Sequence, residues 1–190
     1  MLRKNLGVVF LLAAFPQSVS VAAEPAHMTL AGRSNPPIGY FEFCNRTPDE
    51  CGTSEEAKAS YNPTPSQWAD IRKLNAEINK AITHASDEEL YSKEEWWTYP
   101  EEKGDTEDYA LLKQRRLKEY GVPPAALLLT VAIKRNGDGH ALLTMITSDG
   151  DFILDDETDE ILPWRDAPYT MLKRQTPSNS LRWVRVDDPD

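Results

Sequence analysis

The sequence lacks any apolar run long enough to cross a membrane as a helix, which needs about 20 residues. Its most apolar stretch, Leu6–Phe15, is about half that length and follows the basic residues Arg3 and Lys4. The small residues Val21–Ala23 come shortly after it. This order of basic, apolar and small residues is typical of a secretory signal peptide. We therefore predict a signal peptide over residues 1–23, no membrane span after its removal, and a periplasmic or secreted protein.

Positive charge is also scarce. The sequence has 21 Lys and Arg residues against 31 Asp and Glu residues, a formal net charge of −10. Loss of residues 1–23 removes Arg3 and Lys4 and no acidic residue, which takes the charge to −12. We expect neither nucleic acid nor an anionic membrane as a partner of so acidic a chain. Residues 24–190 suit a single domain, and their charge favours a cation such as calcium.

Cysteine is nearly absent, with Cys44 and Cys51 the only two. A metal site at this pair would need two more ligands, and no histidine lies nearby. A catalytic thiol at either position would leave the other cysteine unexplained. In an exported chain, two cysteines this close together favour a disulfide around the loop between them.

The first half of the chain predicts one long helix. Residues 24–63 are rich in Pro and Gly and have no sustained hydrophobic period, which indicates a loop-rich arm pinned by the disulfide. Thr64 suits a helix cap and Pro65 a first turn, and the helix is expected to end near residues 84–86. Its shared apolar face consists of Trp68, Ile71, Leu74, Ile78, Ile82 and Ala85. Residues 87–104 predict a loop with one short helical turn.

The second half predicts a helix followed by strands. Asp105 is a natural cap for a helix over 105–120, which Gly121 ends. The expected strands, separated by turns rich in Gly, Asn and Asp, are 127–134, 140–147, 152–155 and 169–175. Helices that precede an antiparallel meander, without repeats or βαβ units, indicate an α+β fold in which N-terminal helices pack on an antiparallel sheet.

Three residues of this arrangement suit nucleophilic catalysis. Thr106 lies at a helix N-terminus, where the helix dipole activates a thiol and the first amides stabilise an oxyanion. His140 opens one strand and Asp155 closes the next, so the two side chains are expected to lie side by side as base and orienter. Taken alone, His140 would be a hydrogen-bonded strand residue and Asp155 the start of a solvated acidic turn. Together with Thr106 they are the candidate catalytic residues, in a setting built for a cysteine.

Several stretches, in this order along the chain, resemble the bacterial transglutaminase-like cysteine peptidases. They are Cys44–Cys51, Leu74–Asn79, Gly104–Lys113, Gly139–Thr144, Gly150–Asp155, Ile161–Trp164 and Lys173–Gln175. The resemblance covers nearly all of residues 38–185 and implies one papain-like, transglutaminase-like domain over 24–190. It also implies a Cys-His-Asp triad, which falls here on Thr106, His140 and Asp155.

The resemblance further implies a metal site and a class of partner. In relatives that cleave surface adhesins in the periplasm, acidic residues flanking the cysteine bind calcium, and here these residues are Asp105 and Glu107. Carboxylate oxygens suit that ion, although two carboxylates alone are too few ligands. The implied partner is a periplasmic protein or peptide. At the end of the strand that carries the aspartate of the triad, relatives usually have Asp-Asn, whereas this chain has Asp155 and Asp156.

Thr106 departs from the family pattern at the residue on which the reaction depends most. A threonine hydroxyl is far less acidic than a thiol, and threonine nucleophiles usually use their own N-terminal amine. We therefore predict an impaired enzyme that acts as a peptide-binding or protein-binding pseudoenzyme. One alternative is an active periplasmic peptidase that uses Thr106 weakly, or a family enzyme whose cysteine was lost by substitution. Another is a binding module whose acidic loops form the working surface.

Overall fold

The computed structural model describes residues 26–53 and 59–187. The predicted signal peptide, residues 1–23, lies outside the described residues. In chain order the elements are β1 (Thr29–Ser34), α1 (Ile38–Arg46), the 3-10 helix η1 (Pro48–Glu50), α2 (Pro65–Ala81), β2 (Thr83–His84), α3 (Asp87–Tyr91), β3 (Lys103–Gly104), α4 (Thr106–Tyr120), the 3-10 helix η2 (Pro124–Ala126), β4 (Leu127–Lys134), β5 (Gly139–Thr147), β6 (Gly150–Leu154), β7 (Leu162–Pro163), β8 (Tyr169–Thr176) and β9 (Asn179–Asp187). None of the helices in the described parts is long and apolar enough to cross a membrane.

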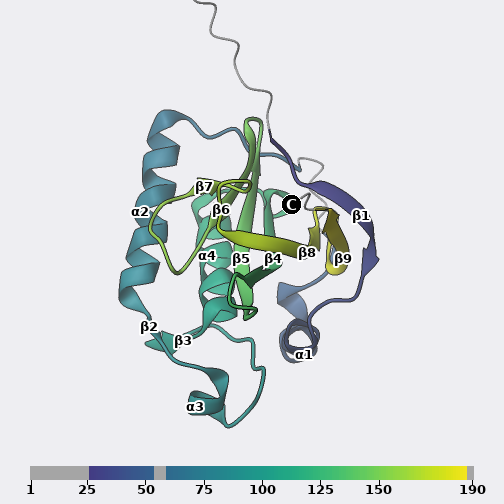
Figure 1. The fold of residues 1–190 in the computed structure, drawn as a ribbon. Helices are drawn as coiled ribbons and strands as arrows, with labels where there is room; N and C mark the ends of the chain where they lie inside the picture. The colour runs from purple at the N-terminus through teal and green to yellow at the C-terminus, as the bar shows by residue number, and fades with distance from the viewer. Residues whose placement is uncertain (1–25, 54–58, 188–190) are drawn as a thin grey trace, which may run out of the picture.

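Seven strands form one curved antiparallel sheet in the order β1-β9-β8-β4-β5-β6-β7, and β2 and β3 form a small parallel pair. The helices α2 and α4 lie on one side of the sheet, and β1 closes its far edge beside β9 (Figure 1). This arrangement confirms the predicted α+β fold of helices packed on an antiparallel sheet.

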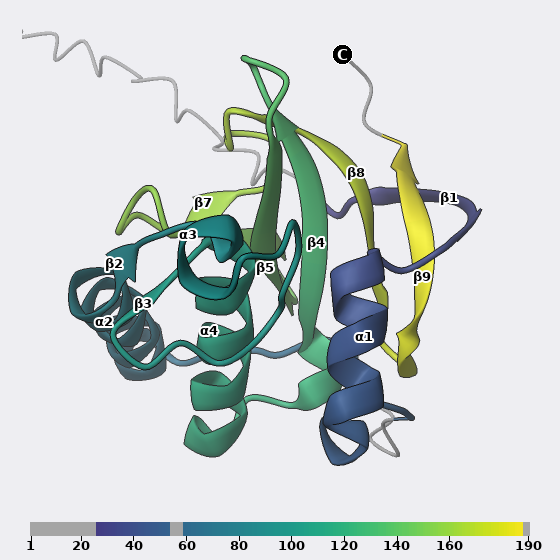
Figure 2. The same ribbon diagram turned by 90° about the horizontal axis from the view of Figure 1, so that it is seen from below.

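Alternation along the strands divides the core between the two faces of the sheet. Leu127 and Leu129 of β4 face the helices and pack with Leu111 of α4, in a cluster that also contains side chains of α1. Ala132 of β4 and Leu142 of β5 belong to a second cluster on the opposite face. Figure 2 shows α1 and α4 standing along the same side of the strands. In the described parts of the chain, the helices therefore cover one face of the sheet. Successive side chains of a strand point to opposite faces, so the second cluster lies on the other face.

The prediction of a loop-rich arm over residues 24–63 is wrong, because β1 and α1 lie within it. Tyr40, Phe43 and Cys44 have helical spacing and are buried in the core, but the helix has only nine residues and begins next to Pro37, so its period is short. The last strand, β9, was also absent from the predicted strands. Its pairing with β1 and β8 holds it in the sheet although its side chains are mostly polar or partly exposed.

The start of α2 was predicted correctly and its end was not. Thr64 accepts a hydrogen bond from the Gln67 amide and forms a full capping box with that residue. The helix stops at Ala81 rather than near residues 84–86, because Thr83 and His84 leave it to pair with β3. That pairing brings the chain after α2 to the residues directly before α4.

The predicted disulfide is present between Cys44 of α1 and Cys51, seven positions apart in sequence. Replacing both residues with serine is expected to lower the free energy of unfolding by about 2 kcal/mol, since even a short closed loop restricts the unfolded chain. Urea denaturation of the variant and of the wild type, each with and without reductant, measures this loss. A double variant whose unfolding midpoint equals that of the oxidised wild type would contradict it.

Candidate active site

Thr106 is the first residue of α4, and its hydroxyl links that helix to the sheet. Its Oγ1 accepts a hydrogen bond from the Ala141 amide of β5 at 2.9 Å and donates one to Glu107 at 3.3 Å. Asp105 occupies the N-cap position as predicted, but its side chain makes no capping hydrogen bond. The Asp105 carboxylate lies instead in a group of acidic side chains.

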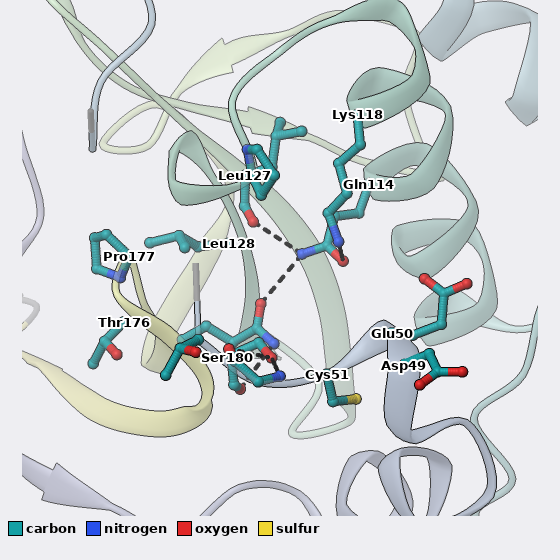
Figure 3. A pocket seen from close by; sticks show the side chains of 14 residues that line it. Asp49, Glu50, Cys51, Gln114, Lys118, Leu127, Leu128, Thr176, Pro177 and Ser180 are labelled. Atoms are coloured by element: carbon teal, nitrogen blue, oxygen red, sulfur yellow. Dashed lines mark hydrogen bonds between the residues drawn. The ribbon is translucent and has the colours of Figure 1, made fainter. Parts of the chain in front are cut away.

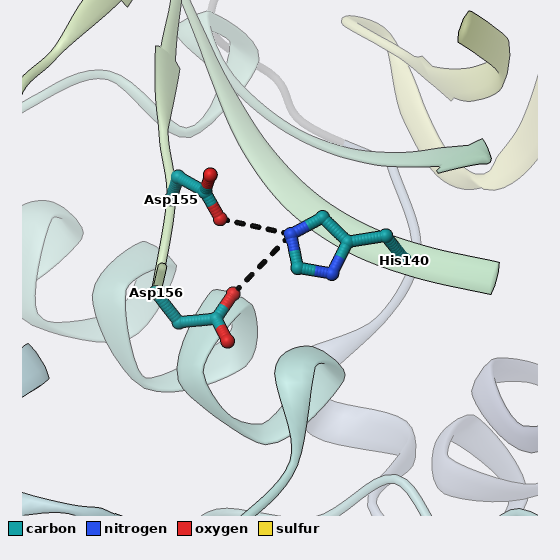
Figure 4. Close-up of side chains that lie close together, drawn as sticks. All are labelled: His140, Asp155 and Asp156. Atoms are coloured by element: carbon teal, nitrogen blue, oxygen red, sulfur yellow. Dashed lines mark hydrogen bonds and ion pairs between the residues drawn. The ribbon is translucent and has the colours of Figure 1, made fainter. Parts of the chain in front are cut away.

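His140 and Asp155 lie side by side, as their strands predict. The register of β5 and β6 pairs Leu143 with Leu154, which brings the start of β5 next to the residue after β6. His140 Nε2 lies 2.9 Å from Asp155 Oδ1, and both side chains are almost fully buried (Figure 4). The other ring nitrogen, Nδ1, has no hydrogen-bond partner within the described residues. The ring is therefore oriented from one edge and free at the other, the arrangement that a general base needs.

The sequence did not identify two residues that hold Asp155 in place. The hydroxyl of Tyr169 donates to Asp155 Oδ2, and the fully buried Lys113 ammonium donates to the Asp155 carbonyl at 2.5 Å. Burial raises the pKa of Asp155, but hydrogen bonds from His140 and Tyr169 outweigh it and lower that pKa to about 2. Asp155 is therefore an anion at neutral pH. Burial lowers the pKa of Lys113 to about 8 despite the nearby Asp156 and Asp155.

A cleft of about 340 Å³ lies in front of Thr106 and His140. Its other lining residues are Pro37, Glu94, Glu95, Trp97, Asp105, Glu107, Val131, Gly139 and Ala141. Thr106 and His140 thus share one cleft, although no hydrogen bond joins their side chains in the described structure. Three predicted residues therefore converge on one place, with the hydroxyl engaged by Ala141 and Glu107 rather than by the imidazole.

The two predicted metal ligands belong to a cluster of three carboxylates. Oxygen atoms of Asp87, Asp105 and Glu107 lie within 4.8 Å of one another. Asp87 Oδ2 accepts a hydrogen bond from the Trp96 amide, whereas Oδ1 of Asp87 and of Asp105 are buried with no partner among the described residues. Burial and mutual repulsion raise the pKa of Asp105 to about 6 and of Glu107 to about 9. A cation with hard oxygen ligands would relieve both costs. Asp87 was missed because it lies 18 positions before Asp105 in sequence.

Without calcium, the free energy of unfolding is expected to fall as the pH rises from about 5 to 8. Burial raises the pKa of Glu107 to about 9 and of Asp108 to about 8, so in this range the folded chain binds more protons than the unfolded chain. The contribution of these two groups to the free energy of unfolding is fully present below their ordinary pKa values. It is lost as the pH rises towards their raised pKa values in the folded chain. Urea denaturation with a chelator measures the slope. Glu107→Gln should flatten it, and an unchanged slope in that variant would contradict the assignment.

A second cavity, of about 300 Å³, lies about two turns further along α4 and contains none of the predicted site residues (Figure 3). Gln114, which lines it, donates to the Leu127 carbonyl at 2.9 Å and to Gln175 at 3.3 Å. Lys118 in turn donates to Gln114 at 3.0 Å. These polar groups bind one another, so this cavity does not have the unpartnered groups that mark the cleft at Thr106.

Comparisons with known proteins place this fold and this sequence. Three solved structures of Legionella pneumophila LapG are similar to this chain, namely a calcium-bound form (TM-score 0.51, 22% identity, 60% of this chain and 66% of that one), an EGTA-treated form (0.50, 23%, 60% and 64%) and a further form (0.53, 22%, 65% and 69%). The match spans less than two thirds of the first two LapG chains. No curated protein matches the sequence. Residues 30–190 match the family described as bacterial transglutaminase-like cysteine proteinase. The chain therefore belongs to the bacterial transglutaminase-like cysteine proteinase family.

Proposed function

We propose that this protein is an exported pseudoenzyme of its family, which binds a peptide or protein in the cleft of Thr106 and His140 without cleaving it efficiently. The observation that carries the proposal is the hydrogen bonding of Thr106. Its hydroxyl proton points to Glu107 and its oxygen accepts from the Ala141 amide, so the hydroxyl is engaged away from His140 Nδ1. These contacts support the proposal, since the hydroxyl that His140 would have to activate is hydrogen-bonded to other groups.

The chemistry of the hydroxyl supports the same conclusion. A nucleophilic thiol loses its proton readily next to a histidine at a helix N-terminus, whereas a threonine hydroxyl holds its proton far more tightly. The dyad of His140 and Asp155 keeps the geometry of a general base and its orienting carboxylate. What remains of the site is therefore a cleft with peptidase architecture and a weak nucleophile.

Calcium is the cation that we propose for the carboxylates of Asp87, Asp105 and Glu107. Three clustered carboxylates, two of them with buried oxygen atoms that lack partners, fit a hard divalent ion whose other ligands are water or carbonyl oxygens. The calcium-bound form of the similar Legionella protein supports this choice. Bound calcium would neutralise the acidic group at the start of α4 and so hold Thr106 and the Trp96 backbone in place.

The partner that we propose is a periplasmic protein or peptide, held in the cleft as an extended segment. Gly139 lies at the open side of the cleft, since a Cβ atom added there would meet no atom within 4 Å. Filling this space with Gly139→Trp is expected to abolish binding of a fluorescein-labelled casein digest, measured by fluorescence anisotropy. Asp138→Asn is the matched control, since Asp138 precedes Gly139 but does not line the cleft. Equal binding by Gly139→Trp and wild type would contradict the proposed binding site.

A further inference from the structure

Asp156 lies between two histidines. Its Oδ1 is 3.6 Å from Nε2 of the buried His140, and its Oδ2 is 3.3 Å from Nε2 of His84. Figure 4 shows the carboxylates of Asp155 and Asp156 approaching the same edge of the His140 ring. Asp155 makes the hydrogen bond at 2.9 Å, so Asp156 is a second negative charge beside a ring nitrogen that is already oriented.

Hydrogen bonds do not account for the burial of Asp156. Only 1% of its side chain is exposed, and neither carboxylate oxygen has a hydrogen-bond partner in the described parts of the chain. Such a carboxylate is costly unless nearby positive charges compensate it. The groups that face it are Lys113 and Tyr109 from α4, His140 from β5 and His84 from β2, besides the neighbouring Asp155. The basic side chains that can supply this compensation are Lys113, His140 and His84.

His84 is held on the surface beside Asp156 by the fold. Its ring stacks on Tyr109 with 4.7 Å between the centroids, and its backbone pairs with Gly104 just before α4. Its side chain is 54% exposed, whereas the His140 side chain is fully buried. His84 does not line the cleft, and it lies beside the other carboxylate oxygen of Asp156 from the one that faces His140.

We propose that Asp156 is a positioning residue that stabilises the positive charge of His140, and that His84 opposes this effect from the surface when it is protonated. The inference rests on the proposed role of His140 as the base of this site. When His140 takes a proton on Nδ1 from a nucleophile, the ring becomes a cation and the nucleophile an anion. Asp156 favours that state because it adds a negative charge at the Nε2 edge. A protonated His84 draws the same carboxylate towards solvent and adds a positive charge nearby, so it disfavours that state.

Titration of Asp156 would make this support pH-dependent. Burial raises the pKa of Asp156 to about 6; the charges of His140 and Lys113 oppose this rise, and that of Asp155 adds to it. The carboxylate is therefore mostly charged at pH 7 and mostly neutral at pH 5. The support that it gives to His140 is present at neutral pH and is lost as the solution becomes acidic.

The test uses the Thr106→Cys variant, in which the introduced thiol reports the charge of His140. Thiolate, not thiol, reacts with iodoacetamide, so the alkylation rate follows the thiolate that the imidazolium stabilises. Adding Asp156→Asn is expected to slow alkylation at pH 7 by about tenfold, the factor of one pKa unit in the thiol, and to move the pH profile upward. Adding His84→Gln is expected to accelerate alkylation at pH 6. Glu160→Gln, which removes a charge from the same loop, is the control and should change neither rate.

Two results would overturn the inference. One is an Asp156→Asn profile that coincides with its parent, and the other is a His84→Gln variant that reacts no faster at pH 6. Because His84 is exposed, its replacement tests the pairing even if Asp156→Asn impairs folding, which thermal unfolding would show. Alkylation needs no peptide cleavage, so the inference and the proposed function fail separately. Shifted profiles in a Thr106→Cys protein that does not bind the casein digest would support the charge pairing and contradict the proposed binding function.

Discussion

Thr106→Cys is expected to increase peptide hydrolysis by several orders of magnitude over the wild type, since loss of a nucleophile from such a site costs a comparable factor. The introduced thiol would lie at the N-terminus of α4, in the cleft that His140 also lines. There the helix dipole and the imidazole both favour the thiolate. The rate of release of fluorescent peptides from labelled casein measures the gain.

Two controls make this gain interpretable. Thr106→Ser removes the methyl group and keeps a hydroxyl, so it should gain little, which separates steric relief from nucleophile chemistry. Thr106→Cys combined with His140→Ala should lose the gain, since the base is absent. A Thr106→Cys protein that folds, binds the casein digest and cleaves nothing would show that the remaining machinery is not a peptidase site.

Calcium is expected to raise the melting temperature of the wild type by roughly 5–10 °C. At a calcium concentration 100 times Kd, binding to the folded state alone adds about 2.7 kcal/mol, and each kcal/mol shifts a domain of this size by about 2–4 °C. The physical reason is the repulsion among Asp87, Asp105 and Glu107, together with the buried Oδ1 atoms of Asp87 and Asp105, which have no partner among the described residues.

Asp87→Asn and Asp105→Asn should each remove most of this calcium-dependent rise and the heat of binding in calorimetry. Both variants should also be more stable than the wild type in the presence of a chelator, because a neutral amide relieves the repulsion. Glu77→Gln, an exposed residue of α2 outside the cluster, is the matched control and should keep the full response. Equal melting temperatures of the wild type with calcium and with chelator would contradict the proposed calcium site.

Asp105 and Glu107 belong to the carboxylate cluster and also line the cleft. Glu107 belongs to the carboxylate cluster and also accepts the hydrogen bond of the Thr106 hydroxyl. A cation bound there would compete for the Glu107 oxygen atoms and so change the partner of that hydroxyl. Bound calcium would therefore act on the start of α4, and not on the dyad of His140 and Asp155.

The convergence of Thr106, His140 and Asp155 could be predicted because each lies at a recognisable boundary. Thr106 is the first residue of a helix and is flanked by acidic residues. His140 and Asp155 lie at the two ends of a hairpin whose turn residues fix its register. The disulfide followed from spacing and expected compartment. Local patterns of this kind can be recognised from a few consecutive residues.

The supporting residues could not be predicted, because only tertiary packing brings them to the site. Asp87 reaches the cluster only because the chain after α2 folds back to the start of α4. Lys113 is a charged residue, which a sequence pattern places on the exposed face of its helix, whereas it is fully buried. Asp156 and His84 carry no local signal of their pairing, since it depends on the contact of β2 with the residues after β6. The early elements β1 and α1 were missed for a similar reason, since their packing partners Val186 and Trp183 lie at the other end of the chain.

The central claim is that the base is in place and that Thr106 does not act as a nucleophile. Intact-mass spectrometry after incubation with 4-nitrophenyl acetate tests it most directly, because a nucleophile that His140 activates becomes acetylated. We predict no adduct on the wild type, one adduct on Thr106→Cys, and a strongly reduced yield when His140→Ala is added. Acetylation of the wild type at Thr106 that depends on His140 would contradict the account, since it would show a working threonine nucleophile.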